Sequence, residues 1–498
     1  MLPQTNGLAS SKDFVIGGRD TGGLSVTLLM LSVVAIYLMM APVWSPRLLW
    51  WRYDNARILE IALLCLIGAM IAIPSLSRAL YERWLELGQS ARVLLVVFCA
   101  AGALSAALSG VPQVGILQIS LVVLLICMTL SIASVVRHTD IQGELVLVFA
   151  ICAGALLVVL QFWAAQAVYI TQGDAFPWVS PFLTFANVRF FSQYQSYALL
   201  LVVFPIGLFK LSRSSKFMLY LLAANFWSLQ WMVGTRAVWV GFIVASLTVA
   251  IFGRADRARW FRQQSIGLVG GLAIFLVFTR LLMPSADAPA IPKQHSVVER
   301  GWESVNERFT MIKGAAGMIQ EHPVLGVGPG QFGHNYSATL AAHPHSSALQ
   351  FLAEYGLIGG GAAILLLAIL GIHALGLIRT ASSGKGSAVG LYVAAALIMG
   401  LVESCFSGNL TMPHSQIMFC VTAGWLLGLK PGPATERADY RMPAMARHTR
   451  FALTSLTLLA VSIVFVLTFE YVHAVHGMPY WLNPNPPNLW QYGRFSAW

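Results

Sequence analysis

The chain has 498 residues, of which 57% are hydrophobic and only 10% are charged, and its mean hydropathy is +0.71. Because soluble domains carry roughly 25% charged residues, this composition excludes a soluble globular protein and predicts an all-α polytopic membrane protein. The formal net charge of +11 lies mostly in short loops between apolar runs and accompanies no base-reading motif, so we expect membrane lipids and no nucleic acid as its partners.

Apolar runs of about 20 residues, the length that spans a bilayer as a helix, occur about thirteen times. They lie near residues 24–42, 57–76, 91–108, 114–136, 144–170, 192–209, 216–232, 236–252, 264–283, 357–379, 386–404, 413–429 and 450–472. Lys and Arg gather in the loops after the even-numbered runs. The positive-inside rule therefore places the N-terminus in the cytoplasm and the loop 284–356 in the periplasm.

Two features depart from this pattern. The first loop on the periplasmic side contains Arg47, Arg52 and Arg57, and we assign these arginines to lipid headgroups. A thirteenth span places the C-terminal tail outside, whereas twelve spans keep both ends in the cytoplasm, and the sequence leaves twelve or thirteen open. We divide the chain into spans at 1–283, a large loop at 284–356, further spans at 357–472 and a tail at 473–498.

The large loop contains signals for two short helices. An apolar stripe at three- and four-residue spacing runs from Trp302 to Ile319 and includes Phe309 and Ile312, which predicts a helix that packs on the membrane domain. Pro323 ends this helix before His322. Glycines at 326, 328 and 330 predict a sharp turn, and Pro344 predicts the start of a second helix.

A histidine motif follows within the same loop. His345-Ser346 is separated by nine residues from Gly356-Leu357-Ile358-Gly359. This spacing resembles the large periplasmic loop of the bacterial O-antigen ligase and polymerase superfamily, which also includes pilin O-oligosaccharyltransferases. The resemblance is strong over the large loop, moderate at Arg236, and elsewhere amounts to hydropathy.

His345 is the first candidate for chemistry. In the first turn of a helix that begins at Pro344, its charged form is disfavoured by the helix dipole, and a neutral imidazole can act as a general base. The alternative is a histidine that only caps or packs. We expect His343 to cap the helix or support His345, together with Ser346.

Arginines on the periplasmic side are the next candidates, because a planar guanidinium grips a pyrophosphate in a bidentate way. Arg236 resembles the family's essential arginine in a short periplasmic loop, and Arg189 is placed likewise. Arg308 resembles the family's arginine upstream of the glycine turn, although Arg300 could be the true equivalent. The alternative for each is contact with lipid headgroups.

Two further residues flank a late loop on the same side. Glu403 is an intramembrane carboxylate that we expect to pair with an arginine and orient it, and His414 lies on the other side of this loop. The six cysteines show no metal-ligand spacing, and no nucleotide fingerprint or acidic metal site is present. We therefore expect no cofactor and no metal.

The resemblance implies a glycosyltransferase in the bacterial inner membrane with its site on the periplasmic side. It implies transfer of a glycan from undecaprenyl pyrophosphate, with inversion, to an acceptor hydroxyl. The His-Ser spacing favours lipid A-core as the acceptor, which is the activity of an O-antigen ligase. A polymerase or a pilin O-oligosaccharyltransferase fits the same residues. The rival class is a transporter of an anionic lipid or solute, which predicts two related halves with broken spans, and no internal symmetry is visible.

Overall fold

The computed structural model describes residues 21–49, 52–139, 141–172, 182–254, 256–282, 299–336, 343–380, 385–429 and 444–476. Nearly all of this part of the chain is helical, and no strand occurs in it. The predicted all-α fold of a polytopic membrane protein is therefore confirmed. Most of the predicted tail and residues 284–298 of the large loop lie outside the described residues.

The helices occur in the order of the predicted spans. They are α1 (Thr21–Met40), α2 (Arg52–Met70), α3 (Pro74–Glu86), α4 (Gln89–Ala107), α5 (Pro112–Thr139), α6 (Ile141–Gln172), α7 (Val188–Ala198), α8 (Phe204–Leu208), α9 (Arg213–Val233), α10 (Arg236–Phe252), α11 (Arg257–Val277) with the π-helical turn η1 (Phe278–Leu282), α12 (Glu299–Glu321), α13 (Phe332–Asn335), α14 (Ser347–Thr380), α15 (Lys385–Ser404), α16 (Pro413–Gly428) and α17 (Ala444–His476). Helices occupy most of every predicted span, but the second is divided between α2 and α3 and the sixth between α7 and α8.

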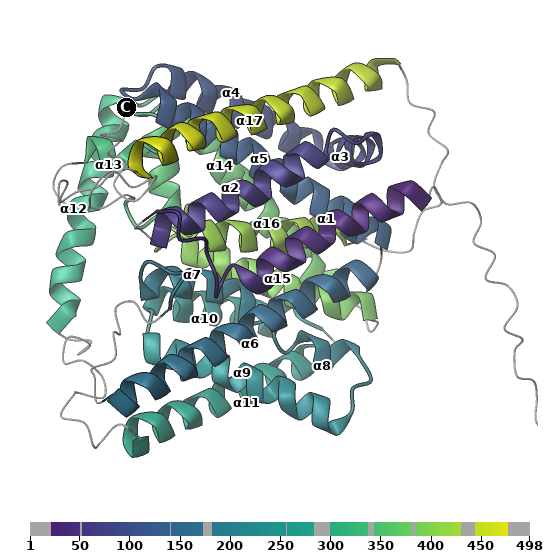
Figure 1. Cartoon of the computed structure of the whole chain (residues 1–498), viewed down its shortest axis with the longest axis vertical. Helices are drawn as coiled ribbons and strands as arrows, with labels where there is room; N and C mark the ends of the chain where they lie inside the picture. Colours follow the sequence, from purple (N-terminus) through teal and green to yellow (C-terminus); the bar gives the residue numbers. More distant parts are fainter. Residues whose placement is uncertain are drawn as a thin grey trace, which may run out of the picture.

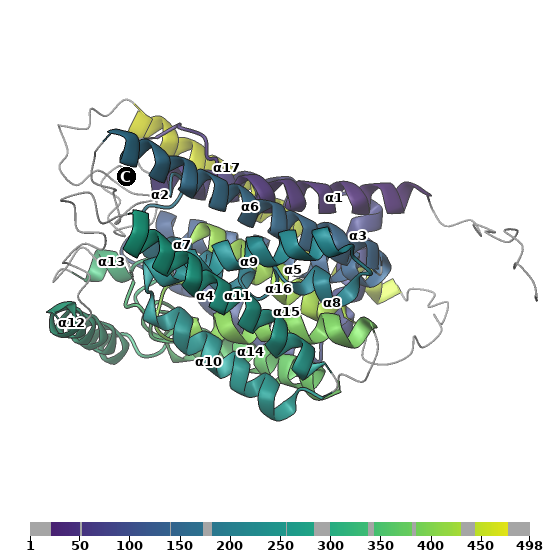
Figure 2. The same ribbon diagram turned by 90° about the horizontal axis from the view of Figure 1, so that it is seen from below.

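Within the described residues, six helices are long and apolar enough to cross a membrane, and a seventh crossing is possible if α2 and α3, which meet at a bend of 99°, form one span. The remaining predicted spans are helical but shorter, broken or richer in polar residues. The total of twelve or thirteen crossings therefore stays a prediction. Figures 1 and 2 show the long helices running in a common direction, with α12 and α13 at one end of the bundle.

Contacts of α17 show at which end this last helix finishes. Near its start, Thr454 Oγ1 lies 3.0 Å from Ser77 Oγ on α3. Near its end, the Tyr471 hydroxyl donates to Asp54 at the start of α2, over 2.9 Å. The start of α2 also contacts the 405–412 loop, which in turn contacts the large loop. The helix α17 therefore ends at the large-loop end of the bundle, as a thirteenth span requires.

Helix α12 ends at Glu321, as Pro323 predicts, but it packs through a different face from the predicted stripe. Phe309 and Ile312 are exposed, at 56% and 43%. The buried face is formed by Met311, Ala315 and Met318, which pack in one small cluster with Val327, Phe332, Tyr336 and Ala353. Gly314 lets the Tyr336 ring approach, since a Cβ there would lie 2.6 Å from it. The buried face of α12 is therefore determined by the close approach of its backbone at Gly314 to Tyr336, and not by its largest side chains.

Candidate active site

The second helix of the large loop begins three residues later than Pro344 predicts. Helix α14 starts at Ser347, and Ser346 caps it: the Ser346 carbonyl accepts from Gln350 N over 3.0 Å, and its hydroxyl accepts from Leu349 N over 3.5 Å. His345 has a φ of +52°, a left-handed conformation that no helical residue adopts. The predicted position of His345 in the first helical turn is therefore wrong, and it lies just before the helix.

His343 holds His345 in this conformation. The backbone N–H of His345 donates to Nδ1 of His343 over 3.2 Å, and the two rings meet edge-on with centroids 4.6 Å apart. His343 is 5% exposed and packs against Gly408, where a Cβ would lie 2.6 Å from the ring. Because Nδ1 accepts this bond, the ring proton of neutral His343 must be on Nε2.

Both imidazoles are held in the neutral form. Burial, followed by the charge of Arg189, lowers the pKa of His343 to about 4. Burial, followed by His343, Arg189 and Arg308, lowers the pKa of His345 to about 2. The predicted direction of the His345 pKa is confirmed, but its cause is burial and the nearby guanidinium groups rather than a helix dipole.

Three of the predicted arginines gather around this segment. Arg189 is the second residue of α7, Arg236 is the first residue of α10, and both are exposed. A bond of 2.8 Å between the hydroxyls of Ser192 and Thr235 joins the two helix starts. Partial burial, followed by the charges of Arg189 and Arg236, lowers the pKa of Arg308 on α12.

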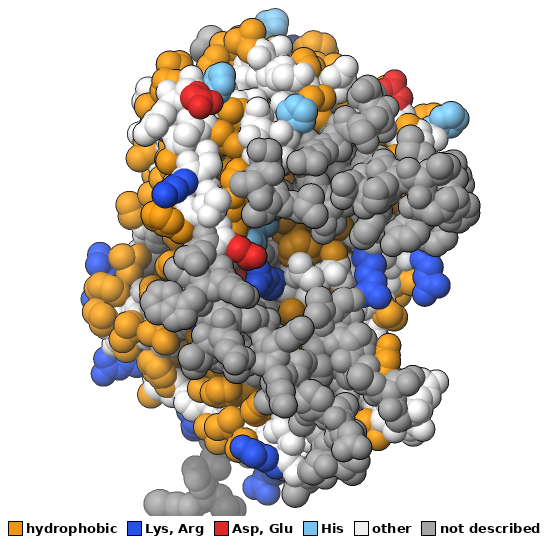
Figure 3. All heavy atoms as spheres, turned by 90° about the vertical axis from the view of Figure 1, so that its left-hand side faces the viewer, with side chains coloured by type: hydrophobic (Ala, Val, Ile, Leu, Met, Phe, Trp, Pro, Cys, Tyr) orange, Lys and Arg blue, Asp and Glu red, His pale blue; other side chains and the backbone are white. Residues whose placement is uncertain are grey.

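These guanidinium groups form an electropositive face beside His345. Within the described residues, none of Arg189, Arg236 and Arg308 makes an ion pair. Figure 3 looks onto this end of the molecule, where Lys and Arg side chains are visible near the centre of the face. Arg300 lies in the first turn of α12, but its side chain is outside the described residues.

The glycine turn of the large loop docks onto a break in α14. Gly356 has a φ of +66° and a non-helical ψ of −170°. Around it, Leu357 N donates to the Pro323 carbonyl over 2.8 Å, and Gly328 N donates to the Glu354 carbonyl over 3.0 Å. The first glycine of the Gly-x-x-Gly motif thus divides α14 into a short segment that directly follows the histidines and a long apolar segment.

Glu354 fastens this turn, a role that the sequence motif did not indicate. Its carboxylate is 2% exposed and accepts from Gly330 N over 2.9 Å, Phe332 N over 3.3 Å and Gln350 Nε2 over 3.1 Å. An acidic residue on an otherwise apolar helix was the signal that could have identified it, because a buried carboxylate needs several donors.

Glu403 and His414 lie apart from the histidine segment. Glu403 is fully buried beside Ser196 and Asn409, and it makes no ion pair within the described residues, so the predicted pairing with an arginine is not found there. His414 Nδ1 lies 3.3 Å from the Tyr37 hydroxyl, and its ring packs on Phe185. Both flank the 405–412 loop rather than the arginine face.

Arg57 was assigned to lipid headgroups, and the structure corrects this assignment. Its side chain is 1% exposed and pairs with Glu60, one turn along α2, over 2.5 Å. The guanidinium also donates to the Thr411 carbonyl and the Gln416 side chain. Thr411 N donates to the Gly408 carbonyl over 2.9 Å, and Gly408 contacts His343. Arg57 therefore fixes the loop against which the histidines are held.

Within the described part of the chain, no three His, Cys, Asp or Glu side chains gather closely enough to hold a metal ion. The groups present can instead do two things. A neutral imidazole can accept a proton, and the guanidinium groups can bind and stabilise an anion.

Comparison with known families agrees with the sequence motifs. Residues 200–364 match the family model Wzy_C, described as O-antigen ligase, and this range includes Arg236, Arg308, His345 and Gly356. No curated protein matches the chain. This match supports the O-antigen ligase and polymerase superfamily that the His-Ser and Gly-x-x-Gly motifs predicted.

Proposed function

We propose that this protein transfers a glycan from undecaprenyl pyrophosphate to an acceptor hydroxyl on the periplasmic side of the bacterial inner membrane. The family supports a glycosyltransferase of the O-antigen ligase and polymerase type. Our proposal of this donor and of a base-catalysed transfer rests on one observation. The neutral imidazole of His345 lies beside Arg189, Arg236 and Arg308. This arrangement offers both an anion site and a proton acceptor.

The arginines bind the donor pyrophosphate in this proposal. Arg189 and Arg236 start two helices that the Ser192–Thr235 bond holds together, so their guanidinium groups approach from one wall. Arg308 approaches from α12. Guanidinium groups that lack carboxylate partners keep their full charge for the phosphate oxygens. The same charge stabilises the leaving group as it develops negative charge.

The chemical step is a direct displacement. The acceptor oxygen forms a bond to the anomeric carbon while its proton passes to an imidazole nitrogen of His345. The bond from that carbon to the pyrophosphate oxygen breaks, and its electron pair leaves with undecaprenyl pyrophosphate. Attack opposite the leaving group inverts the anomeric carbon. The proton on His345 is then released to solvent.

The low pKa of His345 means that the donor must bind before His345 can act as the base. A base with a pKa of about 2 accepts a proton poorly while the arginine charges are uncompensated. A bound pyrophosphate brings negative charges that offset those of Arg189 and Arg308. Each charge at about 6 Å contributes about 3 kcal/mol at an effective dielectric constant of about 20. His345 thus becomes an effective base only when the donor is in place.

The acceptor is the least constrained part of the proposal. We favour lipid A-core, the acceptor of an O-antigen ligase, because of the His-Ser spacing and the single large loop. A growing glycan, or a Ser or Thr of a secreted protein, would use the same residues. Incubation of the purified protein with an undecaprenyl-pyrophosphate-linked glycan and each acceptor in turn distinguishes the three.

The decisive variant is His345→Gln, which keeps hydrogen bonding but cannot accept a proton. It should abolish transfer and leave donor binding largely intact. His334→Gln, at an exposed histidine on α13 of the same loop, is the matched control and should transfer normally. Near-normal transfer by His345→Gln would mean that His345 only positions other groups. Solute flux without transfer would favour the transporter.

A further inference from the structure

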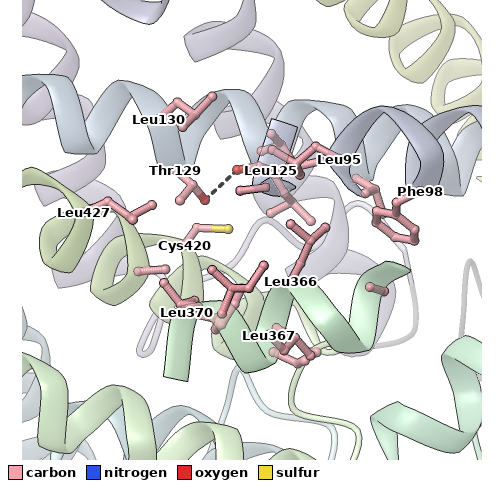
Figure 4. A pocket seen from close by; sticks show the side chains of 18 of the residues that line it. Leu95, Phe98, Leu125, Thr129, Leu130, Leu366, Leu367, Leu370, Cys420 and Leu427 are labelled. Carbon is pink, nitrogen blue, oxygen red and sulfur yellow. Dashed lines mark hydrogen bonds between the residues drawn. The ribbon is translucent and has the colours of Figure 1, made fainter. Parts of the chain in front are cut away.

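An elongated cavity of about 500 Å³ lies between α4, α5, α14 and α16, within the range of pockets that bury small organic ligands. Figure 4 shows the middle of the cavity, where apolar side chains of α4 and α5 form one wall and those of α14 and α16 form the other. These side chains are Leu95, Phe98, Leu125 and Leu130 on the first wall and Leu366, Leu367, Leu370 and Leu427 on the second. Gln118 and Arg137 line its two ends and are about 28 Å apart along α5. The cavity therefore runs through nearly the full depth of a bilayer core.

The two ends of this cavity differ in charge. At the large-loop end it is lined by Gln118, Gln350, Glu354, Thr411 and Gln416, which include a carboxylate and no cation. At the opposite end it is lined by Arg83, Glu86 and Arg137. A phosphate headgroup is therefore favoured only at the end far from His345.

The far end is a built anion site. The Arg83 side chain is 7% exposed, and its Nε has no hydrogen-bond partner among the residues that the structure describes. Glu86 lies 2.5 Å from Arg83 and 3.7 Å from Arg137, so one carboxylate faces two guanidinium groups. Glu82, which does not line the cavity, also acts on Arg83. Helix α4 begins here, no side chain caps its first turn, and Gly88 lines the cavity. Its free N–H groups add a second attraction for an anion.

We propose that this cavity binds an anionic phospholipid, with the phosphate between Arg83, Arg137 and the start of α4 and one acyl chain along the apolar walls. The headgroup lies in the leaflet opposite the large loop, which is the cytoplasmic leaflet in the predicted orientation. Basic pockets between membrane helices on that side suit such headgroups. The bound chain packs α4 against α14, the helix that follows the histidine segment, and so stabilises the fold.

The donor lipid does not fit this cavity in the same way. Its pyrophosphate must reach His345, yet the near end of the cavity has no Lys or Arg among its described lining residues. The arginines suited to the donor lie on α7, α10 and α12, none of which lines the cavity. The phospholipid site is thus separate from the proposed active site, and the proposal does not depend on the transfer reaction.

Thermal unfolding and native mass spectrometry of the purified full-length protein test the proposal, with phosphatidylglycerol and phosphatidylcholine as the added lipids. Phosphatidylglycerol should raise the unfolding temperature more than phosphatidylcholine and should remain bound in the gas phase. Arg137→Gln, at a residue that is 25% exposed, should lower the affinity for phosphatidylglycerol roughly tenfold. Leu366→Trp, which fills the middle of the cavity, should abolish the stabilisation.

Arg78→Gln is the matched control, because Arg78 is exposed on the same helix as Arg83 and does not line the cavity. It should bind phosphatidylglycerol like the wild type. Equal stabilisation by the two lipids, or an equal loss in Arg78→Gln and Arg137→Gln, would overturn the proposal. Displacement of phosphatidylglycerol by a polyprenyl pyrophosphate would assign the cavity to the donor instead. His345→Gln should bind phosphatidylglycerol normally, which separates this result from any failure of the proposed transfer.

Discussion

Replacement of Gly356 by alanine tests whether the break in α14 positions the histidine segment. Gly356 has a φ of +66° and a ψ of −170°, a region that is essentially restricted to glycine. A Cβ at this position would overlap the backbone of Val324, including its carbonyl oxygen. The alanine variant must therefore hold a strained backbone and also move residues 323–328 away from the helix.

The expected cost follows from these two contributions. The backbone strain costs about 1–3 kcal/mol. Separation of the two segments removes four backbone hydrogen bonds, each contributing about 0.5–1.5 kcal/mol. Their donors are Leu357 N, Ile358 N, Val327 N and Gly328 N. The total destabilisation is on the order of 5 kcal/mol. The short helical segment that follows His345 would shift with the turn and move His345 with it, so transfer should be lost as well.

The measurement is denaturant unfolding of the purified protein in detergent, followed by the transfer assay. Gly361→Ala is the control on the same helix, because a Cβ there meets nothing within 4 Å. That variant should be neutral or stabilised by about 0.5–1 kcal/mol, since alanine favours a helix interior. If Gly356→Ala unfolds and transfers like Gly361→Ala, the break does not position the site and our account of the Gly-x-x-Gly motif is refuted.

Three other predictions concern the charged groups. Because burial lowers the pKa of His345 to about 2 and that of His343 to about 4, the unfolded chain binds protons below pH about 6.5 that the folded chain does not. The free energy of unfolding should therefore fall as the pH drops from 7 to 5, by at most about 1.4 kcal/mol per pH unit for each histidine. Arg236→Ala or Arg308→Ala should lower kcat/KM on the order of 10²-fold, and lysine at either position should rescue poorly because it lacks the planar fork. Arg57→Met should cost about 3–5 kcal/mol of folding free energy because Glu60 is left buried without its cation.

Each of these has its own control. His345→Gln should reduce the pH dependence of unfolding, and an unchanged slope would contradict the assigned pKa. Arg280→Ala, at an exposed arginine of the turn after α11, should transfer normally. Full activity of both lysine variants would indicate contact with lipid headgroups. The double variant Arg57→Met/Glu60→Leu should recover much of the stability, and no recovery would mean that the cost comes from the lost contacts to Thr411.

The sequence predicted the parts of the fold that depend on local pattern. Apolar runs located the helices, and Pro323 correctly ended α12. The same information misjudged Pro344, since the choice between a helical turn and a left-handed residue depends on His343, which accepts the His345 N–H. Similarly, the α12 stripe pointed to Phe309, but the fit of Gly314 against Tyr336 decides the buried face. In each case the local structure is decided by a contact that forms only in the folded protein.

For the candidate site, too, the sequence indicated the residues of the local motif but not the roles that depend on distant segments. The motif pointed to His345 and to Arg189, Arg236 and Arg308, which the fold gathers at one end. It did not indicate that Glu354 fastens the glycine turn or that Arg57 is an interior residue. Each of these residues owes its role to segments distant in the chain, Gly330 for Glu354 and Thr411 for Arg57. A single sequence carries no record of such pairings.

The pair of Arg57 and Glu60 also bears on how the chain is made. Helix α2 enters the membrane early in synthesis, whereas Thr411 and Gln416 are translated more than 350 residues later. A lone guanidinium in the bilayer would be costly during this interval. Because its counter-ion lies one turn away on the same helix, α2 can insert as a neutral unit. The other hydrogen bonds of Arg57, to Thr411 and Gln416, form only after the last third of the chain has been synthesised. These bonds then fix the loop against which the histidines are held.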